Sequence, residues 1–166
     1  NLVAYAWGRD NVKEGDIIVT TEYEHHSNIV PWQLLTQEKK AQLKYIDIDD
    51  NGELMLDQLD DYLSTGKVKL VTFSHMSNVL GTISPVEKIV SKCKNAGVKV
   101  LIDAAQSVPH MKVNVNEIGC DFFVFSGHKM LGPTGVGVLW AKKEILEKMS
   151  PFLGGGDMIR EVHKYE

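Results

Sequence analysis

Short apolar runs alternate with amphipathic segments along this chain of 166 residues. The runs are too short for helices and are rich in β-branched and aromatic residues, so they predict buried strands. They cover residues 16–20, 43–48, 68–75, 98–102, 120–125 and 136–140. Only about ten residues separate the last two runs, too few for a crossover helix, so the sixth strand is predicted to return antiparallel.

Apolar positions three and four residues apart predict a helix after each of the first three strands, with Trp32, Leu59 and Ile89 on the buried faces. The third helix carries a capping signature, with Ser84 as the cap and Pro85 at the first helical position. Strands that alternate with helices predict an α/β fold, in which a mainly parallel mixed sheet has helices on both faces.

The composition favours a soluble globular chain, with 43% hydrophobic and 24% charged residues. The net charge of −4 and the lack of a dense Lys/Arg patch argue against nucleic acid as a partner. No apolar run is long enough to span a bilayer, and no signal peptide is found, so no membrane role is expected. The two cysteines, Cys93 and Cys120, are widely spaced, which suits a reducing cytoplasm.

Polar residues collect where the predicted parallel strands end. His25 follows the first strand, Asn78 the third, Asp103 and Gln106 the fourth, and Lys129 the fifth. Since the carboxyl ends of parallel strands meet at one edge of the sheet, we expect these side chains to face one crevice. Singly, each is as well explained by turn chemistry, capping or exposure to solvent.

Together, these residues fit the needs of one cofactor. A desolvated lysine forms a Schiff base with a carbonyl cofactor such as pyridoxal phosphate. That cofactor also needs a carboxylate beside its pyridine nitrogen, because protonation of the nitrogen makes the ring an electron sink. Lys129 and Asp103 would supply both groups.

Two other kinds of site are weighed against this interpretation. His25 and His26 could bind a metal, but adjacent side chains are expected to diverge, and no spacing typical of zinc occurs, so no metal site is expected. The glycines of residues 132–137 suggest a nucleotide loop, but they follow Lys129, whereas a P-loop lysine follows its glycines. These glycines are predicted to form the turn into the last strand.

Five motifs, in the order EHHSNIVPW, SNVLGT, DAAQ, CDFFVFSGHK and GGGDMI, begin at Glu24, Ser77, Asp103, Cys120 and Gly154. With them the chain resembles the class V aminotransferase group of pyridoxal phosphate enzymes, and within it the cysteine desulfurases of the type that serves the Suf sulphur-mobilisation system. The resemblance implies the large domain of the fold type I transferases. Residues 1–153 would be part of that cofactor-binding domain, and residues 154–166 the start of the following loop region.

The resemblance also implies roles for the residues at the strand ends. Lys129 would be the Schiff-base lysine and the base that moves the Cα proton, and Asp103 would pair with the pyridine nitrogen. His25 would stack on the ring and assist proton transfer. The remaining cofactor contacts would come from Asn78, Gln106, Ser126 and His128, the first two near the phenolic oxygen and the last two at the phosphate.

The implied reaction converts L-cysteine to L-alanine and leaves the sulphur on an enzyme cysteine as a persulfide. Cys93 and Cys120 are expected to be buried and unreactive, so the nucleophilic cysteine, the phosphate loop and the carboxylate-binding arginine would lie elsewhere in a longer protein. Residues 1–166 alone are therefore predicted to be inactive. The intact enzyme would be a cytoplasmic homodimer with a possible sulphur-acceptor protein. Another class V reaction (transamination, kynureninase-like cleavage or epimerisation) and a non-catalytic α/β domain are the alternatives.

Overall fold

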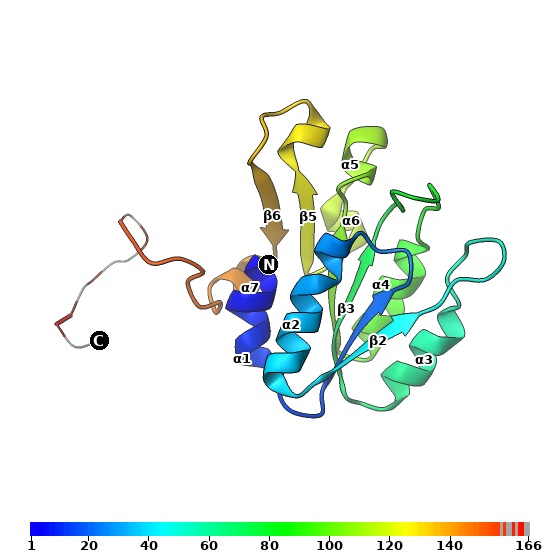
Figure 1. Cartoon of the computed structure of the whole chain (residues 1–166), viewed down its shortest axis with the longest axis horizontal. Helices are drawn as coiled ribbons and strands as arrows, with labels where there is room; N and C mark the ends of the chain where they lie inside the picture. The colour runs from blue at the N-terminus through cyan, green and yellow to red at the C-terminus, as the bar shows by residue number, and fades with distance from the viewer. Residues whose placement is uncertain (157, 159–160, 162, 165–166) are drawn as a thin grey trace.

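A single mixed sheet forms the centre of the computed structural model, which describes residues 1–156, 158, 161 and 163–164 (Figure 1). Its strands are β1 (Ile17–Thr21), β2 (Gln42–Ile46), β3 (Val68–Ser74), β4 (Lys99–Asp103), β5 (Phe122–Ser126) and β6 (Gly137–Ala141). They lie in the order β2-β1-β3-β4-β5-β6, and every neighbouring pair is parallel except β5 and β6. The predicted parallel sheet and its antiparallel return are confirmed. Asp157 and Ile159 of the last motif lie outside the described residues.

Helices and helical turns connect the strands. They are η1 (Ala4–Gly8), α1 (Arg9–Asn11), η2 (His26–Asn28), α2 (Val30–Lys39), α3 (Leu56–Ser64), α4 (Val86–Asn95), α5 (Ser107–His110), α6 (Val115–Ile118), η3 (Gly127–Met130) and α7 (Lys143–Leu146). Within the described part of the chain, none of these helices has the length and apolar character needed to cross a membrane.

Two apolar cores lie on the two faces of the sheet, because successive strand residues point to opposite sides. On β1, Val19 belongs to the core that α3 and α4 cover, while Ile18 belongs to the core that η1, α2 and α7 cover. On β3, Phe73 and Leu70 divide in the same way, and both are fully buried. Burial of one such side chain contributes about 1.5–3 kcal/mol. Helices on both faces were predicted, and this α/β fold is confirmed.

The start of α4 differs from the prediction. Pro85 is the cap residue, and Ser84 makes no capping hydrogen bond, so the predicted capping signature is wrong. The Ser84 hydroxyl instead donates to the backbone oxygen of Ser74. It also accepts from the Tyr23 hydroxyl, at 2.6 Å. Ser84 is only 3% exposed, and buried partners on β3 and after β1 outcompete the local amides of the helix.

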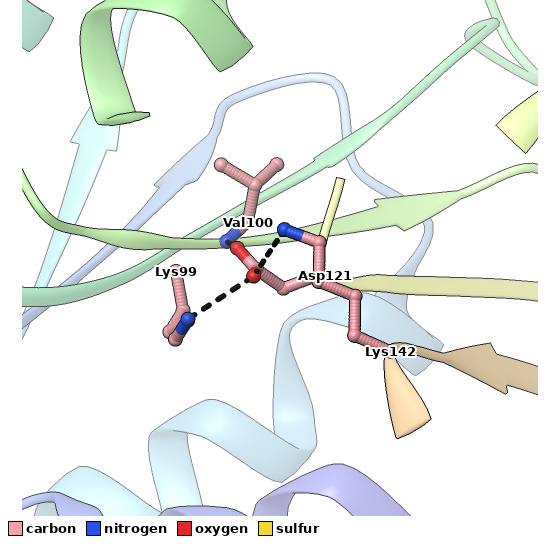
Figure 2. Close-up of polar contacts among 4 residues, drawn as sticks. All are labelled: Lys99, Val100, Asp121 and Lys142. Atoms are coloured by element: carbon pink, nitrogen blue, oxygen red, sulfur yellow. Dashed lines mark hydrogen bonds and ion pairs between the residues drawn. The ribbon is translucent and has the colours of Figure 1, made fainter. Parts of the chain in front are cut away.

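At the amino ends of β4 and β5, the buried carboxylate of Asp121 ties three segments together (Figure 2). Its Oδ1 accepts from Nζ of Lys99 at 3.2 Å and Nζ of Lys142 at 2.9 Å, and its Oδ2 accepts from the backbone N–H of Val100 at 3.0 Å. These contacts fix the edge of the sheet opposite the carboxyl ends of the parallel strands. Asp121 is therefore a structural residue, remote from the crevice predicted at those ends.

Candidate active site

One cavity of about 650 Å³ lies at the carboxyl ends of β1, β3, β4 and β5. This volume is typical of a site for a small molecule. All seven predicted site residues line it, namely His25, Asn78, Asp103, Gln106, Ser126, His128 and Lys129. Its apolar wall includes Trp32, Leu101, Val124, Phe125 and Leu139. The fold thus brings together residues that are far apart in the sequence.

Lys129 lies in η3, a short 3-10 turn that follows β5 directly. The turn is closed by backbone contacts: the N–H of Gly132 donates to the carbonyl of Gly127 at 2.9 Å, and the N–H of Gly127 donates to the carbonyl of Val136 at 2.9 Å. A Cβ on Gly132 would lie only 2.9 Å from that Gly127 oxygen, so only glycine fits. Leu131 ends η3 in the left-handed conformation, with φ at 60°.

Five of the seven predicted site residues have side chains that make no hydrogen bond or ion pair within the described part of the chain. They are Asn78, Gln106, Ser126, His128 and Lys129. Asn78 and His128 are exposed and the other three are half-buried, so their polar groups are open to a polar ligand that enters the cavity. Among these groups, only the Lys129 amine is of the type that condenses with a carbonyl compound to form a Schiff base.

Asp103 ends β4, where it pairs in register with Ser74 on β3 and with Val124 on β5. Its Oδ1 accepts from the backbone N–H of Ala105 at 2.9 Å, which is the local turn contact that a non-catalytic interpretation predicts. Its Oδ2 has no hydrogen-bond partner among the described residues. Burial raises the pKa of the Asp103 carboxyl, although the Ala105 N–H and the positive charge of Lys129 oppose this change. A cationic group bound beside Asp103 would stabilise the ionised carboxylate and lower the pKa of this carboxyl.

His25 precedes η2, and its side chain is held by one close neighbour. Its Nδ1 accepts from the backbone N–H of Ser27 at 3.3 Å and lies 2.8 Å from the Ser27 hydroxyl. This contact assigns the ring proton of neutral His25 to Nε2. The ring centroids of His25 and His26 lie 4.0 Å apart, so the expectation that these side chains diverge is wrong. The turn of η2 folds the exposed His26 back over His25, and His26 does not line the cavity.

Glu24 is a buried residue to which the sequence analysis assigned no role beyond its place in a motif. It follows β1 and hydrogen-bonds to Ser74 at the end of β3, just below the cavity. The available signal is a glutamate three residues after the end of a buried strand and four residues before Asn28, since a buried charge needs nearby donors.

Neither cysteine lies at the cavity. Cys93 and Cys120 are fully buried in the core beneath α4, and burial raises their pKa values to about 12 and about 11, respectively. Such thiols carry almost no thiolate at neutral pH and are poor nucleophiles. The described residues contain no group of three or more His, Cys, Asp or Glu side chains that could hold a metal ion.

Comparisons with known proteins agree with this geometry. The family model described as "Aminotransferase class-V" matches residues 1–166. A cysteine desulfurase of Wigglesworthia glossinidia brevipalpis is 51% identical over 163 residues, which make up 98% of this chain and 40% of that protein. The crystal structure of the cysteine desulfurase CsdA from Escherichia coli matches with a TM-score of 0.94 and 37% identity, over 98% of this chain and 41% of that one.

A third protein matches this chain over a similar share of its length. The apo structure of a cysteine desulfurase from Thermococcus onnurineus NA1 matches with a TM-score of 0.90 and 43% identity, over 98% of this chain and 40% of that chain. The chain therefore spans about 40% of the length of each of these three relatives.

Proposed function

This chain belongs to the class V aminotransferase family, and from that premise we propose that it is the cofactor-binding part of a pyridoxal phosphate-dependent cysteine desulfurase. One observation carries the proposal: the amine of Lys129, without a hydrogen-bond partner among the described residues, and the half-buried carboxylate of Asp103 line the same cavity. The proteins most similar to this chain include several named as cysteine desulfurases.

The donor set of the cavity fits pyridoxal phosphate. When bound, this cofactor supplies an aldehyde that condenses with an amine and a pyridine ring that withdraws electrons from the substrate. Lys129 would hold the cofactor through Nζ and then carry the proton to and from the Cα of the substrate. Asp103 would accept a hydrogen bond from the protonated pyridine nitrogen, using the Oδ2 that no described residue occupies.

The other five side chains would bind and orient. Ser126 and His128, on either side of the Gly127 turn, would hold the phosphate, while Asn78 and Gln106 would donate to the phenolic oxygen. His25 would lie over the ring and exchange a proton at Nε2, because its Nδ1 is engaged by Ser27. The apolar wall of the cavity would limit the access of water.

The proposed substrate is L-cysteine, the product is L-alanine, and the sulphur passes to an enzyme thiol as a persulfide. Cys93 and Cys120 are unsuited to this step, being fully buried, so we assign it to a cysteine outside residues 1–166. The intact enzyme is proposed to be a cytoplasmic homodimer of the Suf type that passes sulphur to an acceptor protein for iron–sulphur cluster assembly. Residues 1–153 would belong to its cofactor-binding large domain.

The test uses the full-length protein, incubated with pyridoxal phosphate, reduced with borohydride and mapped by peptide mass spectrometry. The cofactor mass is expected on Lys129, and L-cysteine is expected to yield equal amounts of L-alanine and transferable sulphur. Lys129→Ala should abolish the adduct and lower the rate of alanine formation by about 10²–10⁴-fold or more, since removal of a general base costs about that much. Lys142→Ala, on the opposite edge of the sheet, should keep both the adduct and the rate. An adduct on another lysine would refute the site. An adduct on Lys129 without alanine would favour another class V reaction.

A further inference from the structure

Glu24 lies at the centre of a buried hydrogen-bond network beneath the cavity. Its side chain accepts four hydrogen bonds, two on each oxygen. The Oε1 atom accepts from the hydroxyl of Thr21 at 2.5 Å and the backbone N–H of Ser74 at 2.7 Å. The Oε2 atom accepts from Nδ2 of Asn28 and from the hydroxyl of Ser74, both at 2.7 Å. Burial raises the pKa of the Glu24 carboxyl, and the hydrogen bonds from these donors oppose that change. No cation contacts this carboxylate within the described part of the chain, so its ionised form depends on these donors.

Asn28 extends the network from Glu24 to two further elements. Its Oδ1 accepts from Nε1 of Trp32 at 3.0 Å and from the hydroxyl of Thr72 at 2.7 Å. The network thus joins β1, η2, α2 and β3. The orientation of the Asn28 amide is determined as well, since its nitrogen must face the carboxylate and its oxygen must face the indole N–H.

His25 lies between the two anchored residues of this segment. Its backbone oxygen accepts from the N–H of Asn28 at 2.8 Å, and Glu24 immediately precedes it. The turn η2 has only three residues, too short to hold a side chain in place without tertiary contacts. Asn28, Trp32 and Ser74 line the same cavity as His25.

We propose that Glu24 is a positioning residue, which holds His25 over the cofactor site by anchoring the segment between β1 and α2 to the end of β3. The proposal rests on the function proposed above for the role of His25. Glu24 itself does not line the cavity. It acts through the backbone and through Asn28.

A carboxylate is needed at this position because two of its partners can only donate. The Ser74 N–H faces one oxygen of Glu24 and the Asn28 amide nitrogen faces the other. A glutamine would point its NH₂ group at one of these donors. Rotation of the Asn28 amide would not relieve the clash, because its nitrogen would then face the indole N–H of Trp32. Glu24→Gln therefore breaks the network while keeping the shape of the side chain.

The experiment compares four forms of the full-length protein: wild type, Glu24→Gln, His25→Ala and the double variant. Asp121→Asn is the matched control, because it also removes a buried carboxylate charge but lies on the opposite edge of the sheet. The first readout, taken without cofactor, is amide hydrogen exchange of residues 25–29. We expect exchange there to be about tenfold faster in Glu24→Gln, the factor typical of a lost buried charged hydrogen bond, and unchanged in Asp121→Asn.

The second readout is the non-additivity of the rates. Glu24→Gln is expected to lower kcat about tenfold in the wild-type background and to have no further effect in the His25→Ala background. Equal losses in both backgrounds, or unchanged exchange of residues 25–29, would overturn the proposal. If Glu24→Gln does not fold, Thr21→Val replaces it, because this variant removes only one hydroxyl donor. It should show a smaller increase in the exchange of residues 25–29 and a smaller loss of kcat that disappears in the His25→Ala background. If neither effect appears, the proposal is overturned. A wild-type protein without a cofactor adduct on Lys129 would refute the proposed function, whereas the exchange result would stand.

Discussion

Gly132→Ala should destabilise the turn that carries Lys129, because the added Cβ meets backbone atoms of Gly127. The added Cβ would lie 2.9 Å from the backbone oxygen of Gly127 and 3.3 Å from its carbonyl carbon. Backbone atoms cannot rotate away as the end of a long side chain can. The two strands that flank the turn, β5 and β6, are paired up to Ser126 and Gly137, so the strain falls on η3 itself.

The expected magnitude follows from two effects. Inserting a methyl group into a packed contact costs about 1–3 kcal/mol. If the turn opens to relieve that contact, the hydrogen bond from Gly132 to Gly127 is lost instead, at about 1 kcal/mol. The turn will adopt whichever response costs less free energy, so we expect the free energy of unfolding to fall by about 1–2 kcal/mol. Either path moves Lys129 relative to Asp103.

Two assays on the full-length protein test this reasoning. Urea unfolding gives the loss of stability, and borohydride reduction in the presence of pyridoxal phosphate gives the share of Lys129 that reacts, which should fall. Gly154→Ala is the control, because among the described residues, its two chain neighbours aside, none places an atom within 4 Å of its Cβ position, and its φ is not in the left-handed region. A Gly132→Ala variant that matches this control in both assays would refute the steric argument.

Two further predictions concern pH and backbone strain. The thiols of Cys93 and Cys120 ionise near pH 9.0 when unfolded, but only at about 12 and about 11 in the fold. The unfolded chain therefore releases their protons first, so stability should be unaffected by them below pH 9 and fall above it, by up to about 1.4 kcal/mol per thiol and pH unit. Urea unfolding at several pH values checks this, and a Cys93→Ala/Cys120→Ala variant without a reduced slope would contradict it. Leu131→Asn should raise the free energy of unfolding by about 0.5–1 kcal/mol, because Leu131 is fully exposed with φ at 60° and asparagine tolerates that conformation better. A lower or unchanged unfolding midpoint would show that Leu131 is not strained.

Much of the fold could be predicted from the sequence because burial on both faces leaves a strong pattern. The continuous apolar run ending in Ile102 indicated a central parallel strand, and β4 lies at the centre of the sheet with strands on both sides. Because the carboxyl ends of parallel strands meet at one edge of a sheet, Asp103 and Lys129 were expected to face one crevice, and both line the same cavity.

The features that were missed depend on how the folded backbone places side chains, which local sequence patterns do not reveal. Ser84 had the local signature of a cap, but its hydroxyl is used by Ser74, and no local pattern reports a partner ten residues away. The stacking of His25 and His26 depends on a three-residue turn that sequence periodicity does not reveal. The role of Glu24 was missed because the donors that bury its carboxylate include the backbone N–H and the hydroxyl of Ser74, which lies 50 residues further along the chain on β3.

The position of β3 between β1 and β4 has a consequence for how the protein is made. On a ribosome, β1 and β2 emerge first, but the edge that β1 offers to the rest of the sheet stays open until residues 68–74 appear. His25 therefore shares the cavity with Ser74 and Asn78 once β3 has paired with β1, Asp103 arrives when β4 joins β3, and Lys129 follows only with β5. Each parallel pairing must also close a long loop before it gains any contact. The cavity is thus a late product of folding, and a nascent chain that stalls before Ala141 would display open strand edges beside an incomplete cavity.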